Sequence, residues 1–366
     1  MVVKELKLKN FRNYDEETFL FDKNVNIIYG NNAQGKTNVL EGIYLFSLGK
    51  SNRAAKEAEL IKFESQKAEA ELIFCDTNRE NTAKISIYKN KRKTLTLNEI
   101  PVKKNSEIVG KFSAVYFGPE YLDLIKGGPK KRRKNIDIII SQIRVSYFSA
   151  ILELKKIIEQ KNALLKSKVY DKNVLYILNE KLLEVSLIIV KMRFEYLKKI
   201  EEKAKKLQRE ISFAKEDFSI KYISPIGAIE NFSEENFLNE MKIKLENSLE
   251  REIILGESTV GPHRDDIEFK INGFDVKNFA SQGQQKTVVL VQKIAELELL
   301  KEEKGEYPVL LLDDIMSELD EKRREFVTSK IKNTQIFITC TEKDRFYKFN
   351  QGKFFKIESG KIVKEG

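Results

Sequence analysis

The sequence predicts an α/β fold into which a mainly helical arm is inserted. An apolar strand, a glycine-containing loop and a helical pattern follow one another between residues 25 and 45. Helices and strands alternate again from residue 284 to residue 340. Between these regions, residues 143–196 carry apolar side chains at the three- and four-residue spacing of long helices. The predicted architecture is therefore two α/β segments with a helical insert between them.

The first α/β segment is expected to begin with short strands. Residues 4–9 and 14–21 alternate apolar and polar side chains, as the two strands of a hairpin do. Similar stretches lie at 70–74, 83–88, 93–97 and 114–117, with a turn at Asn98 and Glu99. We expect residues 118–134, which contain Gly and Pro, to form a loop.

The insert is expected to be a short antiparallel helical hairpin. Its first helix covers residues 143–166, and its second carries a heptad-like apolar series from Leu175 to Tyr196. A break at residues 169–173 separates them, and a strand at 218–222 and a helix at 234–253 follow. The predicted domains are a first head lobe at 1–117, a helical lobe with the arm at 118–256, and a second head lobe at 257–366.

The second α/β segment has a regular order. A strand at 266–271 ends in the turn residues Asn272 and Gly273. A helix at 284–303, a strand at 308–313, a helix at 321–332 and a strand at 335–340 are then expected. This alternation is typical of a parallel sheet covered by helices.

Composition favours a cytoplasmic globular chain. Of the 366 residues, 41% are hydrophobic and 33% are charged, and no apolar run reaches the roughly 18 residues of a membrane span. The N-terminus lacks the apolar stretch of a secretion signal. Only Cys75 and Cys340 occur, far apart, which argues for a reducing compartment. The single histidine, His263, excludes a multi-histidine metal site.

The net charge of +10 has two explanations that charge alone leaves open. Either the partner is a polyanion such as DNA, or the chain reflects a general richness in lysine. Six basic residues lie between positions 126 and 135: Lys126, Lys130, Lys131, Arg132, Arg133 and Lys134. We predict that Lys130, Lys131, Arg132 and Arg133 contact DNA, against the alternative of a solvated surface.

A phosphate-binding loop is the strongest single motif. The pattern G-x-x-x-x-G-K-T lies between a predicted strand and a predicted helix, as a Walker A loop requires. Lys36 is predicted to reach the β- and γ-phosphates of ATP, and Thr37 to ligate Mg²⁺. The predicted nucleotide-binding residues of the loop are Gly30, Asn31, Asn32, Ala33, Gln34, Gly35, Lys36 and Thr37.

A second strand supplies the carboxylates that such a site needs. The apolar run at 309–312 ends in Asp313 and Asp314. We predict that Asp313 holds Mg²⁺ as a Walker B residue and that Asp314 polarises the attacking water. The predicted catalytic residues are Asp314 and the phosphate-binding Lys36. The alternative is a strand that ends in ordinary polar residues. Because 277 positions separate Lys36 from Asp313, the helical insert must lie between two strands that are neighbours in the sheet.

Two further motifs flank the Walker B strand. Ala280, Ser281, Gln282, Gly283 and Gln284 precede it and are similar to the LSGGQ signature, with Ala for Leu and Gln for the first Gly. Residues 317–320 follow it and are similar to a D-loop, in which Ser317 and Asp320 are the candidate site residues. The order predicts an ABC-type P-loop ATPase head. Since a signature loop serves the nucleotide of a second subunit, we expect Ser281, Gln282, Gly283 and Gln284 to act in trans in an ATP-dependent homodimer.

The complete set resembles the RecF family, small ABC-type recombination and repair ATPases of bacteria. Residues 10–14, 118–122, 128–133 and 261–266 match further family motifs, and the resemblance runs in order from about residue 3 to about residue 345. It implies that Arg12 contacts the nucleotide. It also implies ATP-dependent binding of single- and double-stranded DNA at gaps and junctions, with the RecO and RecR proteins as partners in loading the recombinase.

Several residues depart from the family pattern or stay ambiguous. Asn52 stands where an aromatic residue is expected, and the strand at 336–341 lacks a switch histidine, as the family itself does. Asp314 replaces a Glu that reaches further, so we expect a weak ATPase. A Q-loop glutamine is missing near Glu120, with Gln142 as a possible substitute. His263 could be a base or a structural residue.

Other protein classes fit less well. An SMC/Rad50-like or overcoming-lysogenisation-type ATPase would carry a longer coiled coil or a nuclease domain. A transporter cassette would carry the switch histidine, and a small-molecule kinase has no use for a signature motif. Tyr14 could stack on adenine or be a half-buried strand aromatic.

Overall fold

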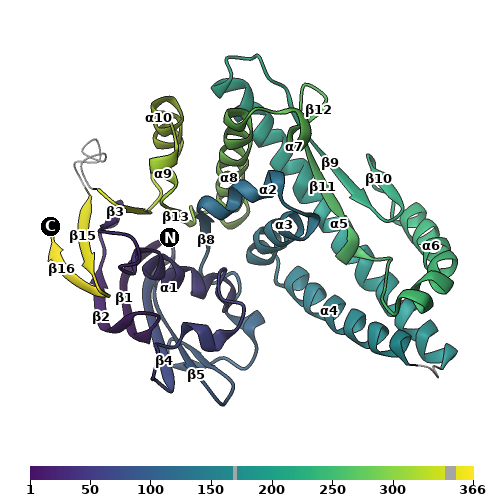
Figure 1. Ribbon diagram of the computed structural model, residues 1–366, viewed down its shortest axis with the longest axis horizontal. Helices are drawn as coiled ribbons and strands as arrows, with labels where there is room; N and C mark the ends of the chain where they lie inside the picture. Colours follow the sequence, from purple (N-terminus) through teal and green to yellow (C-terminus); the bar gives the residue numbers. More distant parts are fainter. Residues whose placement is uncertain (168–170, 343–351) are drawn as a thin grey trace. The chain divides into compact units, whose positions relative to one another are not determined.

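The computed structural model describes residues 1–167, 171–342 and 352–366 and divides into two compact units (Figure 1). The first unit combines residues 1–121 with residues 296–366, and the second contains residues 122–295. Within the described part of the chain, no helix is long and apolar enough to cross a membrane. The α/β fold class with a helical insert is confirmed. The division at residues 117 and 256 stays a prediction.

The first unit contains an antiparallel six-stranded sheet in the order β2-β1-β4-β5-β6-β7. In β1 and β4, buried residues alternate with half-buried or exposed ones because one face of the sheet covers the core. The strands are β1 (Val2–Phe11), β2 (Tyr14–Leu20), β4 (Lys67–Cys75), β5 (Glu80–Tyr88), β6 (Thr94–Leu97) and β7 (Ile100–Pro101). Asn98 and Glu99 form the predicted turn, and both have positive φ.

The second sheet of this unit has the order β16-β15-β3-β14-β13-β8 and is mainly parallel. All residues of β13 and β14 are buried, as expected for central parallel strands. Its strands are β3 (Val25–Tyr29), β8 (Ala114–Phe117), β13 (Val309–Asp313), β14 (Ile336–Cys340), β15 (Lys353–Glu358) and β16 (Lys361–Glu365). The sequence did not predict β15 and β16, which alternate weakly and lie at the sheet edge.

Helix α1 (Lys36–Leu48) packs against strands of both sheets and is buried on nearly all sides. It ends at Gly49, whose φ of 67° suits glycine. The other helices wholly within this unit are short: η1 (Glu57–Leu60), η2 (Asn105–Glu107), α9 (Ile315–Glu318) and α10 (Glu321–Lys330). The short helix η3 (Pro119–Leu122) ends at the first residue of the second unit. The phosphate-loop helix is therefore fixed rigidly between two sheets.

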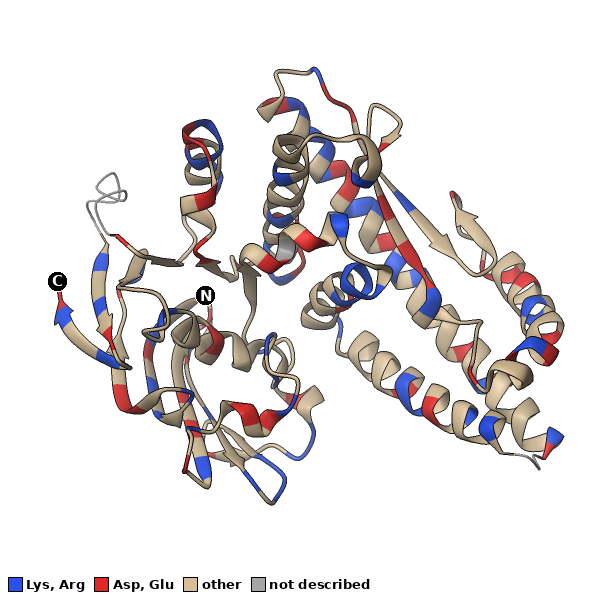
Figure 2. Cartoon of the chain, in the orientation of Figure 1, with Lys and Arg blue, Asp and Glu red and all other residues tan. Residues whose placement is uncertain are grey.

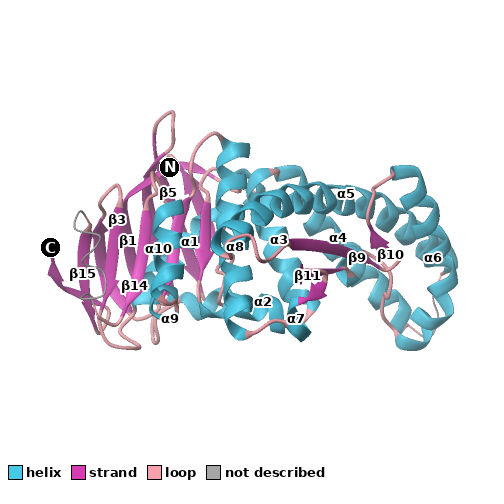
Figure 3. Cartoon of the chain, turned by 90° about the horizontal axis from the view of Figure 1, so that it is seen from above, coloured by secondary structure: helices cyan, strands magenta, loops and turns pink. Residues whose placement is uncertain are grey.

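The second unit is mainly helical (Figure 3). Helices α4 (Val145–Lys166) and α5 (Lys172–Ile211) pack together as the predicted hairpin. The remaining helices are α2 (Asp123–Lys126), α3 (Pro129–Ile143), α6 (Glu234–Leu255), η4 (Pro262–Arg264), α7 (Val276–Phe279) and α8 (Gln282–Lys304), whose last residues belong to the first unit. A four-stranded sheet, β10-β9-β11-β12, contains β9 (Phe218–Ser224), β10 (Gly227–Ile229), β11 (Asp266–Ile271) and β12 (Phe274–Asp275).

One local prediction is wrong and one falls partly outside the structure. Residues 118–134 are not a loop, because α3 begins at Pro129 and includes most of the basic run. Pro is favoured at the first position of a helix, where its missing N–H costs nothing. The expected break at 169–173 overlaps residues 168–170, which lie outside the described residues, and α5 has already begun at Lys172.

Candidate nucleotide-binding site

The loop between β3 and α1 has the backbone geometry of an anion cradle. Gly30 and Gly35 adopt φ of 148° and 115°, and Ala33 is also left-handed at 64°. A Cβ atom on Gly30 would lie 2.4 Å from the carbonyl oxygen of Ile357, and one on Gly35 would lie 2.7 Å from the Asn13 side chain. Both glycines are therefore required for this loop to fit. No side chain among the described residues caps α1 at Gly35, so its first N–H groups point out of the helix end.

The Lys36 side chain is hydrogen-bonded to the backbone of this loop. Its ammonium donates to the carbonyl oxygens of Gly30, at 2.8 Å, and Asn31, at 2.9 Å. The side chain is 5% exposed, and within the described residues it forms no ion pair. A buried cation held only by neutral carbonyls is poorly compensated. It is suited to receive an anionic ligand.

The C-terminal hairpin braces the same loop. The backbone N–H groups of Ser359 and Gly360 donate to the side-chain and main-chain oxygens of Gln34, at 2.5 and 3.0 Å. Asn13 donates to the same main-chain oxygen at 2.8 Å. Gln34 therefore links the phosphate loop to the turn between β1 and β2 and to the turn between β15 and β16. The sequence does not predict this contact because β15 and β16 carry no nucleotide-binding motif.

Asp313 lies at the end of β13 and accepts three hydroxyl hydrogen bonds. Thr37 and Thr339 donate to its Oδ1 at 2.9 and 2.6 Å, and Tyr116 donates to its Oδ2 at 2.5 Å. The predicted Thr37–Asp313 pairing thus brings together residues 276 positions apart in the chain. Tyr116 and Thr339 were not predicted. Burial, followed by the charge of Asp313, raises the pKa of Tyr116, so its hydroxyl stays a donor.

Asp314 has a strained backbone beside this carboxylate. Its φ is 54°, and its N–H donates to the Thr339 hydroxyl at 2.9 Å. Burial raises its pKa most, the charge of Lys36 lowers it, and that of Asp313 raises it again. Left-handed residues of this kind are common at functional sites. The role of Asp314 in polarising the attacking water stays a prediction.

Glu120 occupies the place where a Q-loop residue is expected. It follows β8, the neighbour of β13 in the sheet. Burial, and then the charge of Asp313, raise the pKa of its carboxyl group. Gln142, the possible substitute, is fully buried in α3 of the second unit. The structure therefore places Glu120, rather than a glutamine, close to Asp313.

These residues fit Mg·ATP by their donor chemistry. The uncapped helix start, the glycine cradle and Lys36 suit phosphate oxygens. A hydroxyl and a carboxylate, Thr37 and Asp313, are the hard oxygen ligands that Mg²⁺ prefers alongside phosphates.

Arg12 and Tyr14 both form hydrogen bonds within the protein. The Arg12 guanidinium forms a two-bond ion pair with the fully buried Glu41, at 2.9 and 2.8 Å. A nucleotide contact by Arg12 stays a prediction. Tyr14 is fully buried and its hydroxyl donates to the Gly35 carbonyl at 3.1 Å. An adenine base cannot stack on it in this conformation.

The signature and D-loop residues form local caps. Ser281 and Gln284 bond reciprocally at the start of α8, and Gln284 also donates to Glu216 at 2.8 Å. Ser281 and Gln282 are exposed, and Gly283 is half-buried. In the first unit, Ser317 donates to the Asp314 carbonyl at 2.6 Å, and Asp320 caps α10. Their roles across a dimer stay predictions.

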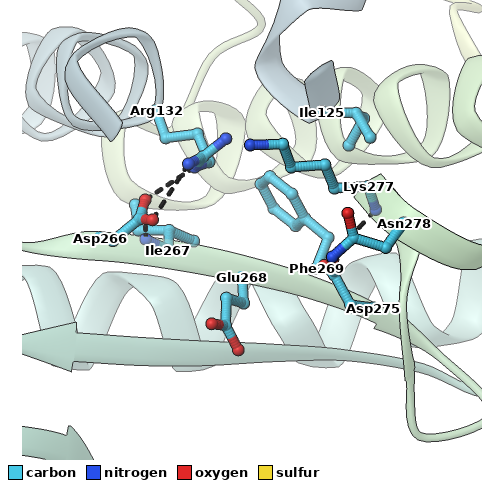
Figure 4. Close-up of a pocket in the computed structure, with 9 residues that line it drawn as sticks. All are labelled: Ile125, Arg132, Asp266, Ile267, Glu268, Phe269, Asp275, Lys277 and Asn278. Carbon is cyan, nitrogen blue, oxygen red and sulfur yellow. Dashed lines mark hydrogen bonds and ion pairs between the residues drawn. The ribbon is translucent and has the colours of Figure 1, made fainter. Parts of the chain in front are cut away.

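The basic run is split between the surface and the interior of the second unit. Lys130 is exposed, and Lys131 pairs with Asp123. Arg132 is only 6% exposed and bonds Asp266 at 2.7 and 3.0 Å beside a cavity of about 210 Å³ (Figure 4). Arg133 donates to the Asp265 carbonyl. A DNA contact by Arg132 would require breaking its internal ion pair, so that prediction is better supported for Lys130.

His263 is half-buried and follows Pro262, whose carbonyl oxygen accepts a hydrogen bond from Arg193. Its Nε2 lies 3.1 Å from the Ser258 carbonyl oxygen, and its buried Nδ1 has no partner among the described residues. Burial lowers the His263 pKa to about 4. Arg193 is 1% exposed and bonds both Asp137 and Asp265. This surrounding supports the structural alternative for His263.

Known proteins resemble the whole chain. The family model described as the RecF/RecN/SMC N terminal domain matches residues 2–362. The DNA replication and repair protein RecF of Clostridium acetobutylicum is 40% identical over 366 residues, which cover 99% of each chain. The protein of that name from Acetivibrio thermocellus is 41% identical over 368 residues, with the same coverage.

Solved structures are also similar to this chain. A structure of the recombination mediator protein RecF with ATP, in the RecFOR pathway, has a TM-score of 0.93 and 38% identity. The match covers 100% of this chain and 97% of that chain. An SMC head bound to the C-winged helix domain of ScpA matches at a TM-score of 0.55 and 17% identity. That second likeness shows the fold alone.

Proposed function

The chain belongs to the RecF family, and from this premise we propose that it is an ATP-dependent DNA-binding protein of replication and recombinational repair. The observation that carries the proposal is the phosphate loop itself. Lys36 is buried without an ion-pair partner in the described chain, and Thr37 meets Asp313 at 2.9 Å. A solved relative is described as bound to ATP, which supports the same ligand here.

The nucleotide would be held by residues of the first unit. The loop N–H groups and Lys36 bind the phosphates, and Thr37 and Asp313 hold Mg²⁺. The metal, when bound, neutralises charge on the phosphate oxygens. Asp314 orients water with a carboxylate that is one carbon shorter than that of Glu, so hydrolysis is slow. ATP then acts as a timing switch.

Dimerisation follows from the signature loop. Ser281 and Gln282 are exposed on the second unit, at the N-terminal end of a long helix. Such an end attracts phosphate. In a two-fold dimer, each subunit would contribute Ser281, Gln282, Gly283 and Gln284 to the nucleotide of its partner. ATP would thus join two subunits.

DNA binding would use the charge of the joined subunits. Lys and Arg are spread over both units rather than gathered in one element (Figure 2). Binding through phosphates would depend strongly on salt and little on sequence. We propose gaps and junctions of single- and double-stranded DNA as the target. RecO and RecR are the proposed partners in loading the recombinase, supported by the RecFOR pathway named for the solved relative.

The test combines light scattering with DNA-binding anisotropy, with and without a non-hydrolysable ATP analogue. We expect the analogue to produce a dimer and to strengthen binding to a gapped duplex, because two subunits double the contacts. Ser281→Arg should bind the analogue but stay monomeric. Ser149→Arg, an exposed serine on α4, is the matched control and should dimerise. Equal DNA affinity with and without the analogue would contradict the proposal.

A further inference from the structure

The Walker B carboxylate is held on both of its oxygens by side chains from three different elements. Thr37 comes from α1, Thr339 from β14 and Tyr116 from β8. The two threonines donate to Oδ1, and Tyr116 alone, among these three, donates to Oδ2. The two oxygens therefore have different surroundings. Oδ1 faces the P-loop threonine, and Oδ2 faces the tyrosine.

The strand register explains how Tyr116 reaches this position. In the parallel pair of β8 and β13, Tyr116 lies opposite Leu311. Leu311 and Asp313 are two residues apart and so point to the same face of the sheet. The Tyr116 side chain spans this diagonal and places its hydroxyl 2.5 Å from Asp313. A shorter polar side chain at position 116 would not extend across the diagonal.

Packing alone does not require the hydroxyl. The Tyr116 ring is 2% exposed and lies edge-on to the Tyr44 ring, with centroids 5.7 Å apart. A phenylalanine would keep this contact. Tyr44 is equally buried, yet its hydroxyl has no hydrogen-bond partner among the described residues. The two tyrosines thus share one apolar cluster and differ in whether the hydroxyl contacts the Walker B carboxylate.

We propose that Tyr116 is a positioning residue for magnesium, whose hydroxyl holds Oδ2 of Asp313 so that Oδ1 stays directed at Thr37. The inference rests on the proposed Mg·ATP site. Residues that bond to a metal ligand fix its orientation, and their loss typically lowers metal affinity by about 10- to 100-fold. Thr37 has two oxygen lone pairs, so it can ligate a cation with one of them and keep its O–H bond to Oδ1 of Asp313. Tyr116 holds the other carboxylate oxygen and so keeps Asp313 in the orientation that this bond needs.

The test is isothermal titration with a non-hydrolysable ATP analogue, once in excess Mg²⁺ and once in EDTA. The quantity compared is the ratio of the two dissociation constants. Tyr116→Phe should leave the affinity in EDTA unchanged. It should reduce the magnesium enhancement, which is the dissociation constant in EDTA divided by that in Mg²⁺, by about tenfold. Tyr44→Phe, the matched control, should keep the wild-type ratio. A wild-type ratio in Tyr116→Phe would overturn the inference.

A double-mutant cycle separates positioning from packing. In an Asp313→Asn background, Tyr116→Phe should cause no further loss of magnesium enhancement, because the hydroxyl acts through that carboxylate. An equal loss in both backgrounds would overturn the inference. Thermal denaturation without nucleotide checks that each variant is folded. If the wild-type chain bound no nucleotide, the proposed function itself would fail, independently of Tyr116.

Discussion

Lys36 in the first unit and Arg193 in the second are both buried cations, and they differ in what surrounds their charge. Arg193 donates to Asp265 at 2.7 Å and to Asp137 at 2.9 Å, and it also bonds the Pro262 carbonyl. Among the described residues, Lys36 donates to two carbonyl oxygens, those of Gly30 and Asn31. Direct ion pairs within its own unit thus balance the charge of Arg193, whereas no carboxylate of the described residues forms an ion pair with Lys36, although the Lys36 charge lowers the pKa of Asp314.

The difference separates a structural cation from a ligand-binding one. Burying a charge is costly unless it is paired, so a fold keeps an unpaired buried cation only where another requirement maintains it. For Lys36 the requirement we infer is phosphate. For Arg193 it is the connection of α3, α5 and the segment that follows η4. The following predictions test that distinction.

The largest effect is expected from Arg193→Met. This change leaves Asp137 and Asp265 without their counterion, and breaking a buried pair typically costs about 3–5 kcal/mol. Urea denaturation followed by circular dichroism should show that loss. Arg209→Met on the same helix is the control, since Arg209 is exposed and pairs with Asp217 at the surface. That pair should contribute about 1 kcal/mol or less. Similar losses in both variants would contradict the structural role of Arg193.

For Lys36→Ala we expect a loss in nucleotide affinity rather than in stability. Hydrogen bonds to charged groups contribute about 1.5–3 kcal/mol, so affinity for Mg·ATP should fall at least tenfold. Isothermal titration measures it. Lys23→Ala, an exposed lysine before β3, should bind as the wild type does. Unchanged affinity in Lys36→Ala would remove the phosphate-loop assignment.

The third prediction concerns His263 and the dependence of stability on pH. Its pKa is lowered from 6.5 to about 4 by burial, and then by the nearby cations Arg264, Arg133 and Lys161. The unfolded chain therefore takes up a proton between pH 6.5 and 4 that the folded chain does not. Stability falls as pH falls through this window, by about 2 kcal/mol at pH 5 relative to neutral pH.

Urea denaturation of the wild type and His263→Gln at pH 7 and pH 5 checks this effect. Gln can still donate to the Ser258 carbonyl, and it does not titrate. The variant should lose about 2 kcal/mol less than the wild type on acidification. The same loss in both proteins would mean that His263 is already accessible to protons in the folded state.

Sequence predicted the parts of the site whose residue types are set by ligand chemistry. Glycines at positions 30 and 35, Lys36, Thr37 and Asp313 form a pattern because phosphate and magnesium demand those groups. Their contact across 276 positions followed from placing two strands side by side. The fold class followed from the same strands and from the helical spacing of the insert.

The parts that sequence missed depend on three-dimensional neighbours. Tyr116 lies in a short apolar strand and resembles any core aromatic until the register of β8 and β13 is known. Gln34 gains its contacts from a hairpin more than 320 positions away. Arg132 belonged to a basic run, and only the fold revealed Asp266 as its partner. Charge patterns show where cations are, not what neutralises them.

The smallest expected effect concerns Lys130, which lies two positions from Arg132 on the same helix. Lys130 is exposed and Arg132 is internally paired. If the run contacts DNA, Lys130→Gln should remove about one phosphate contact. The slope of log affinity against log salt should then decrease by about 0.9, with affinity lowered a few-fold.

Stability should be unchanged within about 0.5 kcal/mol, as for most surface substitutions. Fluorescence anisotropy on a gapped duplex across a salt series measures the slope, and Lys244→Gln on α6 is a charge-matched control. If both variants keep the wild-type slope, Lys130 is a solvated residue. Arg132 and Arg133 would then link α3 to Asp266 and Asp265 inside the unit, and the DNA-binding surface would have to be sought among other lysines.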